Sequence, residues 1–207
     1  ASSRGHMVRK IRDKDILLRR EPASSFAVGR MSDRDLPCPQ LQRLLDYWKA
    51  KWTRGALPGR QHIDPLDLPD LLSNMMLIDV CRDTDPVQFR FRLCGTEIVR
   101  ITGRDLTGLT LDDALPDGYR DYISFLDELV ISKKVPVFSR TLFHDRANFA
   151  NAETSRILLP LATDGETVDM ILVYQLFRYM DQRDPGDTWD VRKPQTALIN
   201  IDDLRLA

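Results

Sequence analysis

A chain of 207 residues, 43% hydrophobic and 29% charged, has the composition of one globular domain with extensions. Its formal net charge of -1 argues against a nucleic-acid-binding protein with a broad basic surface. No apolar run reaches the roughly 20 residues that a membrane-spanning helix needs, and no signal-peptide pattern opens the chain.

Three cysteines, Cys38, Cys81 and Cys94, are present without pairwise spacing and without a Cys/His cluster beside them. This pattern is typical of reduced thiols and not of disulfides or a metal site. We therefore expect a cytoplasmic protein that binds no metal ion.

The first 36 residues carry no sustained hydrophobic period. Residues 1–6, which end at His6, resemble a cloning remnant ahead of Met7, and charged and apolar residues are then mixed as far as Pro22. We predict a flexible arm over residues 8–36.

An amphipathic helix is predicted next, in an N-terminal helical extension that covers residues 37–72. Its apolar side chains recur at helical spacing, and Gly55 and Pro58 follow its end. A second, short helix is predicted where Asp64 precedes Pro65, since Asp caps helix starts and proline suits the first helical position. The stripe of the first helix consists of Leu41, Leu44, Leu45, Trp48 and Trp52.

A domain core is predicted over residues 73–180. Met75–Cys81 is a compact apolar run, and residues 87–93 alternate between apolar and polar, so the two form a hairpin. A helix over residues 117–133 follows two short helical segments. Three more strands are predicted at residues 137–144, 154–162 and 168–177.

This order of elements predicts an α+β fold with a five-stranded antiparallel sheet and helices on one face. The remaining residues, 181–207, form a C-terminal tail that is rich in Asp, Pro and Gly as far as residue 197.

The last predicted strand is apolar on both faces, because Ile171 and Val173 alternate with Met170, Leu172 and Tyr174. A sheet with one solvated face alternates more strictly, so a second layer must cover this strand. The helix that carries Trp48 and Trp52 can supply it, either from the same chain or from a second copy. Its stripe is therefore also a candidate homodimer or partner interface.

Four short motifs in this order resemble a subfamily of PAS domains that was formerly classed as a domain of unknown function. The resemblance spans about residues 41–177 and includes Leu159-Pro160-Leu161. It implies a PAS fold, a sensory role and pairing with protein partners, but no particular ligand. The motifs are Leu44-Leu45-Asp46-Tyr47-Trp48, Gly59-Arg60-Gln61-His62-Ile63-Asp64-Pro65, Phe89-Arg90-Phe91-Arg92-Leu93-Cys94-Gly95-Thr96 and Leu106-Thr107-Gly108.

A PAS domain holds its cavity between the sheet and the helices on one face. We expect Tyr119, Tyr122 and Phe125 of the long helix to line it, and Arg140 and His144 to meet an anionic group. Such a cavity admits a small apolar or amphipathic ligand with one polar end. The competing interpretation is that the aromatic side chains fill the core and that Arg140 and His144 face solvent.

The sequence argues against haem and flavin as cofactors. Haem needs an axial ligand such as histidine, but His62 precedes the sheet and the long helix has no histidine. Flavin photochemistry needs a cysteine in an Asn-Cys-Arg helix, whereas Cys94 precedes Gly95. Asp112 and Asp113 are typical helix-start residues, so no catalytic residue is predicted and the identity of any cofactor stays open.

We therefore predict a sensory and signalling module that is not an enzyme. It would mediate protein–protein interaction, sense a small ligand and give its output through a partner protein, since the chain is too short to hold a kinase or cyclase domain. The alternative is a small ligand-binding carrier or enzyme on a cone-shaped α+β fold. In such folds long helices precede the sheet, whereas here the hairpin precedes the long helix.

Overall fold

One mixed sheet forms the centre of the computed structural model, which describes residues 26–53, 55–145, 150–179 and 194–201. Its strand order is β1-β7-β4-β5-β6-β2-β3, and β1 pairs in parallel with β7 while every other neighbouring pair is antiparallel. The strands are β1 (Val28–Ser32), β2 (Met75–Cys81), β3 (Gln88–Cys94), β4 (Val137–Asp145), β5 (Ala150–Leu161), β6 (Met170–Tyr179) and β7 (Gln195–Asn200). The helices are α1 (Pro39–Ala50), η2 (Arg60–His62), η3 (Pro65–Asp67), η4 (Leu72–Asn74), α2 (Thr96–Thr102), α3 (Leu111–Ala114) and α4 (Asp117–Lys133).

Most predicted elements are confirmed. The hairpin is β2 paired with β3, and the predicted helix over residues 117–133 is α4 with the same bounds. The short helix after Asp64 is η3, whose first turn is capped by the Asp64 carboxylate as it accepts from the Leu66 amide at 2.9 Å.

The predicted five-stranded antiparallel sheet is wrong, because the sheet has seven strands and one parallel pair. The two additional strands come from segments that we assigned to the arm and the tail. β7 pairs with β4 at Val137 and Leu198, and β1 then pairs with β7 at Val28 and Thr196. All of β1 except Met31 is exposed, so it lacks the alternation that predicts a strand.

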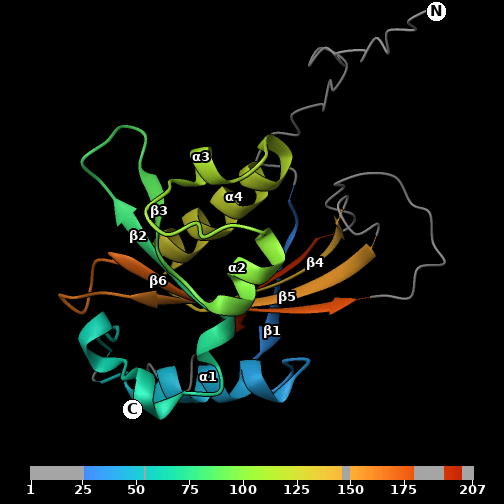
Figure 1. Cartoon of the computed structure of the whole chain (residues 1–207). Coiled ribbons are helices and arrows are strands. Elements are labelled where there is room, and N and C mark those ends of the chain that lie inside the picture. Colours follow the sequence, from blue (N-terminus) through green and yellow to red (C-terminus); the bar gives the residue numbers. More distant parts are fainter. Residues whose placement is uncertain (1–25, 54, 146–149, 180–193, 202–207) are drawn as a thin grey trace, which may run out of the picture.

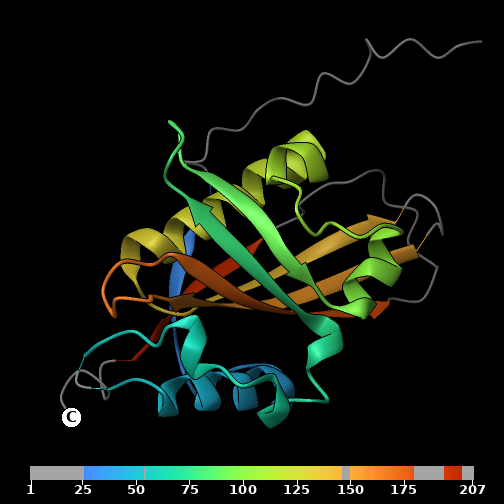
Figure 2. The ribbon, with the colours of Figure 1, turned by 60° about the vertical axis from the view of Figure 1, so that its left-hand side comes forward.

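Helices cover both faces of the sheet, and not one face only (Figure 1). Helix α1 lies on one side and α2, α3 and α4 on the other (Figures 1 and 2). In Figure 2 the β2–β3 hairpin runs steeply across the direction of β4 and β5, so the sheet is strongly twisted. The structure therefore has three layers.

Helix α1 is held against the sheet by its predicted apolar stripe. Trp52, at the end of the stripe, is partly buried, and its ring lies edge-on to Trp48 with 5.1 Å between centroids. The Trp48 indole Nε1–H donates to the Pro160 carbonyl at 2.9 Å. Strand β4 begins at Val137, which pairs with Leu158 of β5, so β4 does not reach Pro160. The Pro160 carbonyl therefore accepts its hydrogen bond from α1 and not from β4. Four stripe side chains are 0% exposed: Leu41, Leu44, Leu45 and Trp48.

The second face of the sheet is therefore covered from within the same chain. A dimer interface made by these four side chains would require α1 to leave the sheet, since none of them has exposed surface. Dimerisation through this helix stays a prediction.

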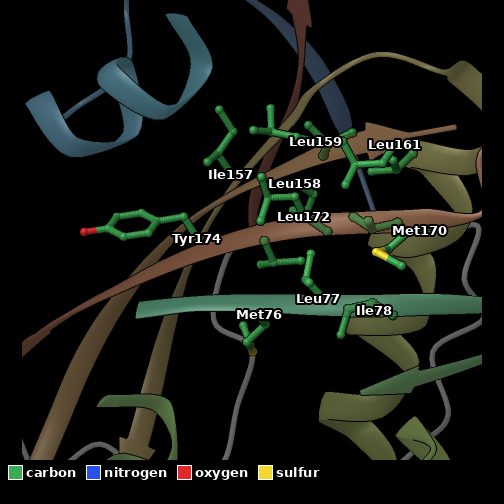
Figure 3. Packing of buried hydrophobic residues seen from close by; sticks show 14 of the residues in the cluster. Met76, Leu77, Ile78, Ile157, Leu158, Leu159, Leu161, Met170, Leu172 and Tyr174 are labelled. Carbon is green, nitrogen blue, oxygen red and sulfur yellow. The ribbon is translucent and has the colours of Figure 1, made fainter. Parts of the chain in front are cut away.

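Both faces of β6 are buried, as its two-sided apolar pattern predicted. Ile171 is 0% and Leu172 is 2% exposed. Figure 3 shows how residues of β2, β5 and β6 pack, with Met76 and Leu77 on opposite sides of β2. None of the helices in the described ranges combines the length and apolar character needed to cross a membrane.

Candidate functional site

A cavity of about 500 Å³ lies between the sheet and the α2–α4 layer. Its floor comes from β2, β3, β5 and β6, and its walls from α2, the segment after α2, the end of α3 and one face of α4. The size is typical of small-ligand pockets, which range from about 300 to 1,000 Å³. The apolar lining includes Met76, Ile78, Phe91, Ile98, Ile101, Leu106, Leu115, Ile123, Leu126, Leu158, Val173 and Phe177.

One polar end of this cavity is built around Arg156 of β5, a side chain that is only 1% exposed. Its cross-strand neighbour on β6 is Gln175, whose Oε1 accepts from the Arg156 Nε–H at 2.8 Å. The remaining guanidinium N–H groups point to hydroxyls, and the ring of Tyr119 lies 5.4 Å from the guanidinium carbon. These hydroxyls belong to Tyr119, Ser139, Thr141 and Thr154.

The charge of Arg156 has no ion-pair partner. Within the described ranges, no carboxylate oxygen lies within 4.0 Å of its guanidinium nitrogens. Buried charges in proteins are normally paired, because removing an ion from water is costly. An unpaired buried arginine on a cavity wall is therefore suited to binding an anionic group.

A second buried ionisable group, Asp127 of α4, lines the same cavity. It is 1% exposed, and its Oδ2 atom has no hydrogen-bond partner within the part of the chain that the structure describes. Burial raises the pKa of the Asp127 carboxyl well above its usual range; the Arg156 guanidinium lowers it and Glu128 raises it further. Asp127 follows Tyr119 and Ile123 at four-residue intervals, so the three share the face of α4 that lines the cavity.

Two more arginines lie at exposed positions of the lining. Arg100 forms an ion pair with Glu97 at 2.6 Å, and an Arg104 Nη donates to the Ala114 carbonyl at 2.8 Å. The cavity wall thus carries three arginines against one acidic residue, which favours anionic molecules at its entrance.

Of the four predicted ligand-binding residues whose side chains the structure describes, Tyr119 alone lies on this cavity wall. The Tyr122 hydroxyl is bound to Ser139 Oγ at 2.8 Å and Thr196 Oγ1 at 2.9 Å, beneath β4 and β7. Phe125 packs against Tyr122 and Phe26. These two aromatics follow the competing interpretation, in which they fill the core.

Arg140, which we expected to bind an anion, is not part of the described cavity lining. Arg140 lies on β4 and pairs with Glu153 of β5 at 3.6 Å. The side chain of His144 lies outside the described residues. Whether any of the five predicted residues binds a ligand stays a prediction.

Sequence reasoning missed Arg156 and Asp127, although each left a signal. Asp127 falls on the apolar stripe of α4, three residues before Val130, where a solvated carboxylate is not expected. Arg156 lies between Thr154 and Leu158 at two-residue spacing, so the three share one face of β5, and all three are buried. A charged residue at a core position is a stronger pointer to a site than an aromatic one.

The described part of the chain contains no group of three or more His, Cys, Asp or Glu side chains arranged to hold a metal ion. Burial raises the pKa of the Cys94 thiol to about 11, so this cysteine is protonated at neutral pH and is a poor nucleophile.

Comparison with known families decides the assignment: a family model described as PAS domain matches residues 37–174. The chain belongs to the PAS domain family. PAS domains are general sensory and signalling modules and are usually not catalytic. No curated protein matches the chain significantly. The PAS assignment removes the alternative of a cone-shaped carrier or enzyme fold.

Asparagine in place of Asp127 is expected to stabilise this PAS domain, by an amount that grows with pH. Because burial raises the pKa of the carboxyl, the folded protein binds its proton more tightly than the unfolded chain, where aspartic acid titrates near about 3.9. The wild type therefore loses stability as the pH rises from about 4 to the folded pKa, whereas the amide does not ionise.

Urea unfolding between about pH 5 and pH 8 measures this difference in the free energy of unfolding. Asp121→Asn, on the same helix but paired with Arg120, provides the baseline for an Asp-to-Asn change. A difference between the wild type and Asp127→Asn that stays constant over this range would contradict the prediction.

Proposed function

We propose that this PAS domain senses a small, largely apolar ligand with an anionic end, bound in the cavity between the sheet and helices α2–α4. The observation that carries the proposal is the guanidinium of Arg156, which is buried on a largely apolar cavity wall and has no ion-pair partner among the described residues. Ligand occupancy would be reported to a separate protein partner.

The present partners of Arg156 leave room for a stronger acceptor. Its bonds to Ser139 Oγ and Thr141 Oγ1 are 3.5 and 3.4 Å long, at or beyond the long end of the usual range. All its acceptors are neutral, whereas a carboxylate or phosphate oxygen forms charge-assisted bonds of about 2.7–2.9 Å to guanidinium. An anionic ligand group therefore gains more from Arg156 than the surrounding hydroxyls do.

The position of the cavity also supports a sensory role. Residues of α2 and α4 and of the central strands β5 and β6 line the cavity, so a bound ligand would contact both the helical layer and the sheet. A change in their packing is the kind of event that a partner protein can detect. Homodimerisation remains a proposal, and its candidate interface is the α1 stripe of Leu41, Leu44, Leu45, Trp48 and Trp52.

Native mass spectrometry of freshly purified protein tests the proposal. We expect a fraction of the wild type to carry a bound small molecule that is lost after unfolding, dialysis and refolding. Arg156→Gln, which removes the charge, should reduce that fraction by about tenfold, since a bond to a charged group contributes about 1.5–3 kcal/mol.

Arg90→Gln is the matched control, because Arg90 lies on β3, is exposed and bonds to Asp79 outside the cavity. The proposal fails if the wild type carries no small molecule, or if Arg156→Gln retains the same bound mass at the same level as Arg90→Gln.

A further inference from the structure

Two ionisable side chains, one basic and one acidic, line the cavity without forming an ion pair with each other. Arg156 projects from β5 and Asp127 from α4, and each is 1% exposed. They are separated by more than the 4.0 Å of an ion pair, since no such contact joins them, yet the guanidinium still lowers the pKa of the carboxyl. The two side chains therefore interact electrostatically without direct contact, and both line the same cavity.

Each of the two side chains lacks one kind of partner. Among the described residues, Arg156 has neutral acceptors but no anion, and Asp127 Oδ2 has no donor. A simple carboxylic acid would satisfy Arg156 and leave Asp127 without a donor, and a simple amine would do the reverse. Leaving either group buried and unsatisfied is unfavourable by about 1–3 kcal/mol or more.

From this pair we infer the class of ligand, and the inference rests on the proposed function above. We propose that the cavity binds an α-amino acid with a large apolar side chain. Arg156 receives its carboxylate and Asp127 its ammonium group.

The chemistry of the two groups matches this ligand. Guanidinium offers paired donors to a carboxylate, and an ammonium group offers three donors and no acceptor, as an unpartnered carboxylate oxygen requires. Both ligand charges sit on one carbon, so a single small molecule can bridge two side chains that do not reach each other. The ammonium group also offsets the desolvation that disfavours an ionised Asp127.

The remaining lining suits a bulky apolar side chain. Phe91, Ile98, Leu158 and Val173 are among the apolar side chains that line the same cavity. At about 500 Å³ the cavity exceeds the needs of the smallest amino acids, so an aromatic or long aliphatic side chain fills it best.

Three probes that differ by one group each test the inference by isothermal titration calorimetry. They are L-phenylalanine, 3-phenylpropanoate, which lacks the amine, and 2-phenylethylamine, which lacks the carboxylate. The wild type should bind phenylalanine at least about tenfold more tightly than either truncated probe.

Variants of the acidic residue then assign the ammonium group. Asp127→Asn should weaken phenylalanine binding by about tenfold or more and leave 3-phenylpropanoate unchanged. Asp121→Asn, on the same helix but outside the cavity lining, should bind all three probes as the wild type does.

The outcomes separate the two proposals. If 3-phenylpropanoate binds as tightly as phenylalanine, or if Asp127→Asn weakens both equally, the amino-acid inference is overturned and an anion-binding sensor stands. If no probe binds while native mass spectrometry finds another bound molecule, the inference alone fails. If neither experiment finds a ligand, both proposals fail.

Discussion

Replacing Trp48 with alanine is expected to lower the free energy of unfolding by about 3–5 kcal/mol, the usual cost of removing a buried aromatic side chain. Trp48 is 0% exposed and is the largest fully buried side chain of the described residues. Its loss would leave a void between α1 and β5 and expose the carbonyl of Pro160. We expect a destabilised monomer and not the dissociation of a dimer.

Replacing Trp48 or Trp52 with phenylalanine separates the contribution of ring packing to stability from that of the indole hydrogen bond. Trp48→Phe keeps most of the ring but removes the donor to Pro160, which should cost about 1–3 kcal/mol. Trp52→Phe removes an indole Nε1–H that is buried without a partner, so it loses no hydrogen bond and should cost less.

Urea unfolding followed by far-ultraviolet circular dichroism measures these variants without relying on tryptophan fluorescence. Sedimentation of the same samples reports their oligomeric state. The interpretation of α1 as an intrachain cover would be wrong if Trp48→Ala left stability unchanged but converted a dimer into monomers.

The elements that the sequence predicts well are those whose signal is local. Helix α4 has a continuous apolar stripe that contains Leu126 and Val130, and it begins after Pro116 and ends before Pro136. The sequence of strand β3 alternates between polar and apolar residues from Gln88 to Leu93, so the strand could be placed from its own residues.

The two outer strands could not be predicted in the same way. Strand β1 is five residues long and mostly exposed, and its partner lies at the opposite end of the chain, where Met31 pairs with Ile199. Pairing at such a separation depends on tertiary contacts that leave no period in either segment. The same nonlocality explains why the sheet looked five-stranded from sequence.

The predicted and the observed cavity lining differ for a related reason. The sequence predicts that the aromatic residues of α4 line the cavity, whereas the structure turns the Tyr122 hydroxyl towards Ser139 and Thr196. Whether the predicted residues bind a ligand stays a prediction. The face of α4 that does line the cavity carries Tyr119 and Asp127. A stripe shows that a helix is buried, but only packing shows which of its edges meets an open space.

Alanine at Gly95 is expected to destabilise the fold by an amount at the upper end of the about 1–3 kcal/mol range for overpacking. Gly95 is the residue at which β3 passes into α2, and it is also part of the motif that resembles the PAS subfamily. Its backbone N–H donates to the Met75 carbonyl at 2.7 Å, which fixes its position.

A Cβ atom at this position would lie well under 3.0 Å from the backbone carbonyl oxygens of Leu72 and Ser73. These are backbone atoms of η4, so no side-chain rotation relieves the overlap, and η4 or α2 must move. Gly118→Ala is the matched control: a Cβ on Gly118 meets no atom within 4 Å, and the change should stabilise α4 by about 0.4–1 kcal/mol.

The displacement of α2 should also reach the cavity, because Ile98 and Ile101 of this helix form part of its wall. Hydrogen–deuterium exchange should therefore quicken in α2 of Gly95→Ala, with little change in α1 on the opposite face. Equal protection of α2 in the wild type and in Gly95→Ala, together with unchanged stability, would show that the β3–α2 junction tolerates a side chain. The close approach of η4 would then not be the reason for glycine at this position.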